Sequence, residues 1–328
     1  MEPEQISVYI NFSSLDLIQQ CMKKAYFRLH RSLAAEIEHP ALTTGKGVHK
    51  ALEVWYAGKR EDRKASSWQT DQNISRLLAG QEPDLTGKDL RVAAIAAYLN
   101  ETDSLKNNPN LEARDRSNVI NILNAYFDYY LEDEFELFSD KDGPFLERSF
   151  ELPVPLSRNY YEAPFEKKPL RIYLHGTIDM ILQNALTGSL VVTDHKTSSS
   201  LGKDFINRIK PNFQYTGYFW GAMEYFELQP EYFMVNGLQI AKTKQSFLRQ
   251  RTHISLDEIE DLWLSLEDAS RRYLDATFAE RWPMSAPNAC TMWGGCEYKQ
   301  VCEVGPKLRE NVLAASFTEV AKNETNGV

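Results

Sequence analysis

Two short apolar segments of the sequence each carry a carboxylate, and the second also carries a lysine. The first, RIYLHGTIDMIL, contains Asp179, and the second, SLVVTDHKTSS, contains Asp194 and Lys196. Side chains on a strand alternate between its faces, so Asp194 and Lys196 project to the same side. The intervening NALTGS, with Gly188, is typical of a hairpin turn, which would bring Asp179 alongside them. Two carboxylates and an amine at one point can hold a divalent metal ion and activate a water molecule against a phosphodiester.

Two histidines near these groups receive no side-chain role in catalysis. His195 lies between the acid and the lysine, so its side chain faces the opposite side of the strand. His175 lies four residues before Asp179, on the same face but further along the strand.

The elements around the two acidic segments alternate between helical and strand-like patterns. Strands are indicated by PFLERSFELPVPL, YFMVNGLQIAK and SFLRQRTHIS. Helices are expected over 13–31, from Gly47 to Tyr56, over 212–226 and over 256–280, with capping boxes at Ser13/Asp16 and Ser255/Glu258. Strands interleaved with helices indicate an α/β core with helical additions.

The pattern predicts five parts along the chain. These are an N-terminal helical part of the core (1–57), a helical insertion (58–138), the core (139–281), a cysteine-rich region (282–316) and a disordered tail (317–328).

Composition narrows the class of protein. With 328 residues, 43% of them hydrophobic, the chain should fold, and no apolar run is long enough to span a bilayer. The acidic start lacks the layout of a signal peptide, so we expect a cytoplasmic protein. A formal net charge of -9 argues against nonspecific coating of nucleic acid, but not against an enzyme with a local basic groove.

Further residues fall in a suggestive order around the acidic strands. His49 closes a Gly-x-x-x-His segment upstream, and Asp179 ends a Gly-x-x-Asp. Downstream, Gln214 and Tyr218 are spaced by four, which places them on one face of a helix. Each motif alone is weak, since an acid two residues before a lysine occurs four times; only the instance at Asp194 lies in an apolar strand.

Taken together and in this order, the motifs resemble the PD-(D/E)xK nuclease superfamily, and in particular its RecB-like exonuclease branch. That branch includes the CRISPR adaptation exonuclease, AddB-type nuclease domains and many phage proteins. The resemblance implies a restriction-endonuclease-like α/β core, with a mixed central β-sheet flanked by helices, a helical insertion and a C-terminal cysteine-ligated cluster region. It also implies a metal-dependent DNA exonuclease acting on DNA ends or in single strands, in recombination, repair, phage replication or CRISPR adaptation.

The resemblance assigns roles residue by residue. An Mg²⁺ or Mn²⁺ ion would be bound by three side chains and one backbone carbonyl, namely His49, Asp179, Asp194 and the carbonyl of His195. Lys196 would polarise the attacking water and stabilise charge on the phosphate. Gln214 and Tyr218 would position the site and contact DNA, and Glu151, on the preceding strand, is a further candidate helper.

The four cysteines form a second candidate metal site. Cys290, Cys296 and Cys302 are spaced Cys-x5-Cys-x5-Cys, with Cys21 far upstream. In a cytosolic chain such a set indicates zinc or an iron–sulfur cluster before disulfides. The resemblance favours a [4Fe–4S] cluster, but the family tail often has a shorter first gap, which keeps zinc as the alternative.

Two other classes compete with the nuclease hypothesis. One is a non-catalytic DNA-binding or assembly module that retains the nuclease fold. The other is a zinc-stapled protein without a nucleic-acid role. DNA is the expected partner, and a helicase or another recombination or replication protein would suit a RecB-like enzyme. Cleavage polarity, strand preference and oligomeric state stay open, and the location would be the host cytoplasm if the chain is phage-encoded.

Overall fold

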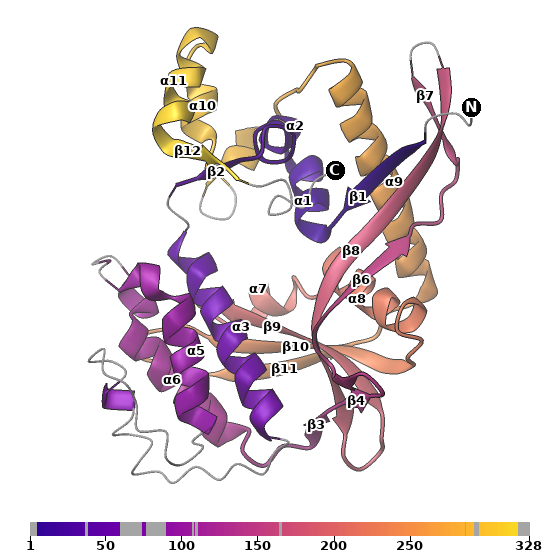
Figure 1. Ribbon diagram of the computed structural model, residues 1–328. Coiled ribbons are helices and arrows are strands. Elements are labelled where there is room, and N and C mark those ends of the chain that lie inside the picture. The colour runs from indigo at the N-terminus through magenta and orange to yellow at the C-terminus, as the bar shows by residue number, and fades with distance from the viewer. Residues whose placement is uncertain are drawn as a thin grey trace. The chain divides into compact units, whose positions relative to one another are not determined.

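The computed structural model describes residues 5–36, 39–59, 74–76, 90–106, 108, 111–163, 166–285, 287–291 and 295–320 (Figure 1). Much of the expected insertion at 58–138 lies outside these ranges. The chain divides into two compact units, each made of separate stretches. The first unit contains Met1–Ile37, Phe150–Gly176 and Ser255–Val328, and the second contains Glu38–Ser149 and Thr177–Ile254.

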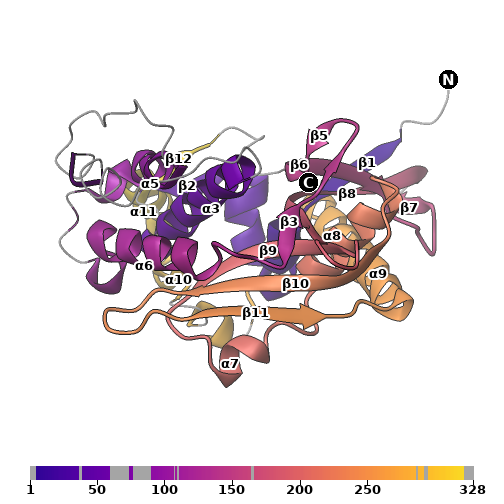
Figure 2. The same cartoon turned by 90° about the horizontal axis from the view of Figure 1, so that it is seen from below.

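The second unit is built on a mixed sheet. The end of β8 (Glu166–Asn184) pairs antiparallel with β9 (Leu190–Ser198), which pairs in parallel with β10 (Pro230–Gln239). β11 (Phe247–Thr252) and β3 (Phe135–Leu137) complete it by antiparallel pairing with β10 and β8 respectively. The run of β9, β10 and β11 is clear in Figure 2. The expected hairpin between the two acidic segments is confirmed, with Gly188 at φ +75° in its turn.

Helices cover both faces of this sheet. On one face, α3 (Pro40–Lys59), α5 (Leu90–Glu101) and α6 (Arg116–Tyr129) share an apolar core with β8, β9 and β10. On the other, α8 (Phe213–Glu224) stacks Tyr215 on Phe233 of β10, with ring centroids 4.6 Å apart. Shorter elements complete the unit: 3-10 turns at Asp103–Leu105 and Glu112–Arg114, the pair β4 (Ser139–Asp140) and β5 (Gly143–Pro144), the start of β6 (Leu146–Pro153), and α7 (Lys203–Ile206).

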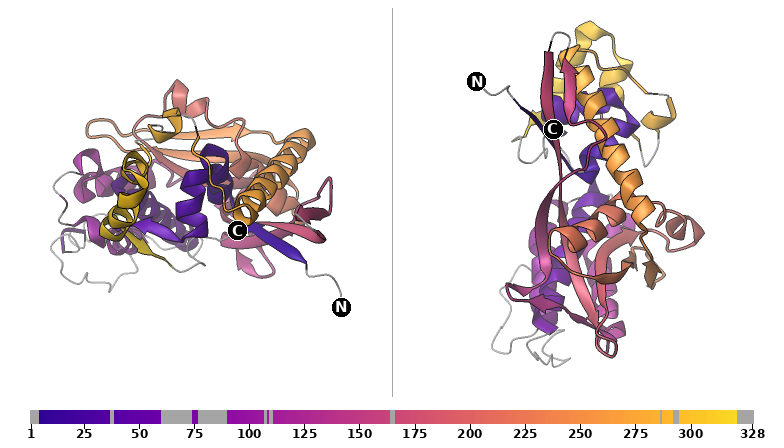
Figure 3. Two further views of the ribbon diagram at one scale, coloured as in Figure 1. Left: turned by 90° about the horizontal axis from the view of Figure 1, so that it is seen from above. Right: turned by 90° about the vertical axis from the view of Figure 1, so that its right-hand side faces the viewer.

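The first unit surrounds the beginning of β8. β1 (Ile6–Ile10) pairs with it in parallel and β7 (Tyr160–Ala163) antiparallel. The long helix α9 (Leu256–Phe278) lies beside α1 (Phe12–Gln20), as Figure 3 shows, and its expected capping box at Ser255 and Glu258 is confirmed. The C-terminal stretch contains η4 (Pro287–Cys290), α10 (Lys299–Glu303) and α11 (Pro306–Ser316).

Four local expectations from the sequence are wrong. The helix expected over 13–31 is interrupted at Cys21, whose backbone is extended, and continues as α2 (Met22–Ala25) and a π-helix (Tyr26–His30). Its N-cap is Asn11, because that side chain accepts the hydrogen bond from the Ser14 amide. α3 begins at Pro40, well before Gly47. The tail continues beyond Ser316 as β12 (Phe317–Glu319), which pairs with β2 (Leu33–Ala35); residues 321–328 lie outside the described chain.

None of the helices in the described ranges is long and apolar enough to cross a bilayer.

Candidate active site

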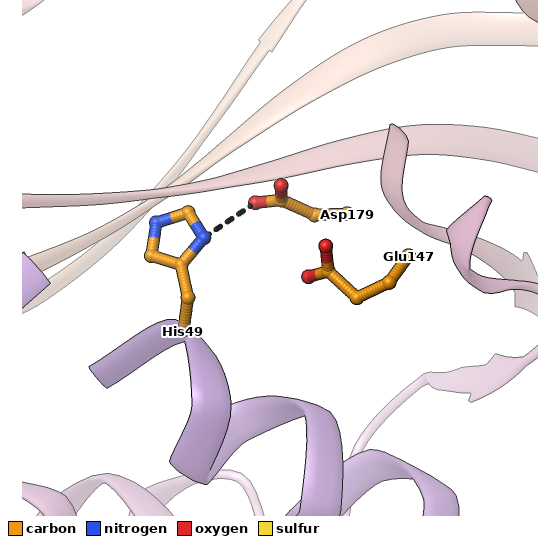
Figure 4. Close-up of side chains that lie close together, drawn as sticks. All are labelled: His49, Glu147 and Asp179. Carbon is orange, nitrogen blue, oxygen red and sulfur yellow. Dashed lines mark ion pairs between the residues drawn. The ribbon is translucent and has the colours of Figure 1, made fainter. Parts of the chain in front are cut away.

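Three ligating side chains meet in the second unit (Figure 4). His49 from α3, Glu147 from β6 and Asp179 from β8 bring one ligand atom each within 4.8 Å of the others. His49 Nδ1 lies 3.2 Å from Asp179 Oδ2. One imidazole nitrogen and two carboxylates form a donor set that suits a divalent ion such as Mn²⁺ or Mg²⁺.

Asp194 and Lys196 adjoin this group from β9. Met180 pairs with Thr193 across the antiparallel hairpin, so Asp179 and Asp194 lie opposite each other at the next position. The Lys196 ammonium lies 3.0 Å from Asp194 Oδ1 and 2.7 Å from Oδ2. Asp194 is only 1% exposed, and both of its oxygens lie close to the Lys196 ammonium. A buried carboxylate next to Asp179 suits a metal ligand.

The carboxyl groups have different tendencies to ionise. Burial raises the pKa of Asp194 to about 6 against the opposing charge of Lys196. Burial, reinforced by the charge of Asp179, raises the pKa of Glu147 to about 7. Burial would also raise the pKa of Asp179, but the His49 imidazolium outweighs it and holds that pKa well below its usual range. In turn Asp179 raises the pKa of His49, although burial alone would lower it.

The His195 side chain points away from Asp194, toward the helices on the other face. Its backbone N–H donates to Asp179 Oδ2 at 2.8 Å, which ties β9 to β8 beside the ligands. Burial lowers the pKa of His195 to about 3, so the ring is neutral at ordinary pH. The Asn236 side-chain amide lies 2.8 Å from its Nδ1, which therefore accepts.

A buried polar network extends from that ring across the core. Its far end is the ion pair of Arg249 with Asp133, made by two contacts of 2.6 Å. Each link is a hydrogen bond, although Asn236 Oδ1 and Arg249 Nε have no partner among the described residues. The network holds the rotamer of His195 and with it the local backbone of β9. The links between the two ends are Asn236 to Tyr126 (2.6 Å), Tyr126 to Tyr56 (2.7 Å) and Arg249 to Tyr56 (2.9 Å).

Asn236→Ala is expected to destabilise the protein by about 1–3 kcal/mol, because it leaves the buried ring nitrogen of His195 without a donor and removes one hydrogen bond from the buried Tyr126 hydroxyl. Divalent-metal affinity should fall roughly tenfold as the β9 backbone loosens. Thermal unfolding and Mn²⁺ titration would measure the two effects. Gln250→Ala on β11, which removes a hydrogen bond to the Arg251 carbonyl, is the matched control. Unchanged metal affinity in Asn236→Ala would show that the network is purely structural.

Gln214 and Tyr218 lie on one face of α8, as their spacing predicts. Gln214 Nε2 donates to the Tyr218 hydroxyl at 2.9 Å, and Asn212 caps the helix. Burial, followed by the charge of Asp194, raises the pKa of Tyr218, which therefore remains a neutral hydrogen-bonding group near the acids.

Glu147 is the site residue that the sequence reasoning missed. The candidate named from the sequence, Glu151, lies four residues further along β6, in the first unit, where its charge acts on His175. Alternation places both glutamates on the same face, so the pattern could not choose between them. Glu147 has φ +46°, a left-handed conformation that is unusual for a non-glycine residue and that clusters at functional sites.

The four cysteines gather in the first unit. All are free thiols, and all line one small cavity together with Lys24, Ser285 and Tyr298. The interruption after α1 places Cys21 there, and η4 and α10 supply Cys290 and Cys302. Burial opposes ionisation of Cys21, but hydrogen bonds led by Ser285 lower its pKa overall. The structure thus brings together the cysteines that the sequence grouped.

A cavity of about 610 Å³ opens beside the acidic site. His49, Glu147 and Lys196 line it, as do Lys46 and Lys50 of α3. A substrate held there would lie against both the ligands and the basic side chains.

The chain belongs to the PD-(D/E)XK nuclease superfamily, whose family model matches residues 9–303. The mixed sheet flanked by helices is the restriction-endonuclease-like fold of that superfamily, as the sequence predicts. Nucleases of this superfamily use divalent metal ions, for which the His49, Glu147 and Asp179 group is suited, and act on DNA.

Two solved structures are also similar. A candidate exonuclease from Eubacterium rectale has 13% identity and a TM-score of 0.40, with 86% of each chain covered. The protein SSO0001 has 15% identity and a TM-score of 0.25, over 55% of this chain and 69% of that one. Both scores are low, so family membership rests on the sequence match. None of the curated proteins matches the chain.

Proposed function

We propose that the protein is an Mg²⁺- or Mn²⁺-dependent deoxyribonuclease of the RecB-like branch that degrades DNA as an exonuclease, from ends or in single strands. The observation that carries the proposal is the convergence of Asp179, Asp194 and Lys196 beside His49, next to a cavity whose walls carry both lysines and glutamates. Family membership supports the reaction class, since phosphodiester hydrolysis needs these groups together.

The side chains take the following roles. His49, Asp179, Asp194 and the His195 carbonyl are the proposed metal ligands, with Glu147 as an additional one. A bound ion would supply Lewis-acid chemistry and would lower the pKa of the attacking water. Lys196, paired with Asp194, stabilises negative charge on the phosphate and orients the water. Gln214 and Tyr218 position the site and contact the strand, and Glu151 stays a candidate helper.

Labelled DNA with Mn²⁺ tests the function directly. Linear single strands and linear duplexes should be shortened from their ends to small products, and closed circular single strands should resist. Cleavage of the circles would show an endonuclease. DNA binding without cleavage in any metal would favour the non-catalytic module instead.

Metal affinity is expected to increase with pH between about 5.5 and about 7.5. Ligands must lose their protons to bind, and the pKa values of Asp194 and Glu147, about 6 and about 7, lie in this window. Each proton released makes affinity up to about tenfold stronger per pH unit below the respective pKa. Calorimetric Mn²⁺ titration at several pH values measures this slope. Glu147→Gln should reduce the slope by about one proton near neutral pH, and an unchanged slope would remove Glu147 from the ligands.

The cysteine cavity is the proposed site of a [4Fe–4S] cluster, with zinc as the alternative. Four thiols from separate stretches around one cavity support metal ligation, because cytosolic thiols gathered in this way bind metal before they form disulfides. Recombination, repair, phage replication and CRISPR adaptation are the proposed settings, with a helicase as a proposed partner. Genomic neighbours would distinguish them.

A further inference from the structure

A second cavity, of about 190 Å³, adjoins the first in the same unit. Lys196 and Thr197 line both cavities. The second cavity continues along β9 and is closed by the segment that leads into α8. Its other lining residues are Ser198, Phe205, Arg208, Ile209, Asn212 and Tyr215.

The two cavities differ in charge. Glu53, Glu101 and Glu147 line the first beside its lysines, which suits a cation site. None of the described residues that line the second carries a carboxylate, while Lys196 and Arg208 bring positive charge. A guanidinium and an ammonium beside a small opening form a donor set that binds phosphate oxygens.

The segment that carries Arg208 is anchored along its length. Phe205 and Leu201 pack over Gly237 of β10, so closely that a Cβ there would lie 3.1 Å from Phe205 Cζ and 2.9 Å from Leu201 Cδ2. At its start, Gln239 Nε2 donates to the Ser199 carbonyl at 2.9 Å. At its end, Lys210 Nζ donates to the His253 carbonyl at 2.7 Å.

These anchors fix the position of Arg208 relative to β9. Its Nε donates to the Asp204 carbonyl at 2.9 Å, which orients the guanidinium from its own backbone. An arginine held in this way loses little freedom when it binds a phosphate, so its contact is stronger than that of a free surface arginine.

We propose that the second cavity is a phosphate-binding subsite for the substrate strand. Arg208, with Lys196 at the shared wall, holds the phosphate that neighbours the one at the acidic site. The shared Lys196 and Thr197 make the two positions adjacent. This assignment rests on the proposed function for its substrate, but it concerns binding and not the reaction.

Equilibrium binding of fluorescent single-stranded DNA by the Asp194→Asn protein, without divalent metal, tests the subsite. Arg208→Gln should weaken binding roughly tenfold and lower the salt dependence by about 0.7, the value for one phosphate contact on a single strand. Arg208→Lys should restore most of the salt dependence. Lys203→Gln, which removes an exposed charge that lines neither cavity, should change both quantities less.

Oligonucleotides with a 5′-phosphate or a 5′-hydroxyl distinguish the two sources of the phosphate. An equal effect of Arg208→Gln on both indicates a backbone phosphodiester, and an effect on the 5′-phosphorylated strand alone indicates a terminal phosphate. If Arg208→Gln alters DNA affinity and its salt dependence no more than Lys203→Gln does, while the wild type cleaves DNA, the subsite proposal is wrong and the nuclease proposal stands. If Arg208-dependent binding is found without any cleavage, the subsite stands and the nuclease proposal fails.

Discussion

Asp194→Asn is expected to reduce DNA cleavage roughly a thousandfold or more, while the protein stays folded. The substitution keeps the shape of the side chain but removes the charge that would hold a metal ion and orient Lys196. Initial rates on labelled DNA with saturating Mn²⁺ measure the effect. Asp142→Asn, at an exposed position in the same unit, is the matched control and should retain full activity. Cleavage by Asp194→Asn at the rate of the control would remove Asp194 from the site.

The same substitution should stabilise the metal-free protein. Burial raises the pKa of Asp194 to about 6, above its ordinary value, so the charged form penalises the folded state. The penalty is absent at low pH, where folded and unfolded chains are both protonated, and is fully present above the folded pKa. At neutral pH, removal of the charge should raise the free energy of unfolding by about 1–3 kcal/mol. Thermal unfolding in chelator at about pH 3, below both pKa values, and at about pH 8 should show the gain only at the higher pH.

If the cysteine cavity binds a metal as proposed, Cys302→Ser is expected to abolish that binding and to destabilise the first unit by several kcal/mol, because the bound metal would contribute to folding. Cys302 and Cys296 pack against an apolar cluster that includes Phe27, Tyr298 and Phe317, so loss of the metal should loosen this cluster as well. Iron, sulfide and zinc analysis of anaerobically purified protein, together with thermal unfolding, gives the result. The wild type should be brown, with about four irons per chain.

Met284→Leu is the control for the cysteine variant, since Met284 lines the same cavity without a thiol. It should keep both metal content and stability. Stoichiometric zinc in colourless wild-type protein would show that the cysteines bind zinc and not an iron–sulfur cluster. Wild-type protein with neither metal would make the four thiols a purely structural group.

The part of the site that lies on the acidic hairpin could be predicted from the sequence. Alternation fixed the common face of Asp194 and Lys196, and a turn around Gly188 sufficed to bring Asp179 opposite them. These are short-range relations, and strand periodicity determines them.

The groups that support the hairpin could not be predicted, because they depend on tertiary packing. Arg249 and Asp133 are separated by 116 positions, and nothing local marks them as partners. Glu147 was missed because its left-handed backbone does not follow from strand alternation. The interruption of the first helix at Cys21 was also not predicted, because the helical spacing of apolar residues continues across that position.

The division of the chain has a consequence for biosynthesis. The stretches of the second unit end at Ile254, so the ribosome completes that unit before the last stretch of the first has emerged. Domains generally fold as units during synthesis. Cys290, Cys296 and Cys302 all belong to the last stretch, whereas Cys21 is translated near the beginning. A metal held by these cysteines would therefore be inserted late, after the acidic pocket has appeared on the nascent polypeptide.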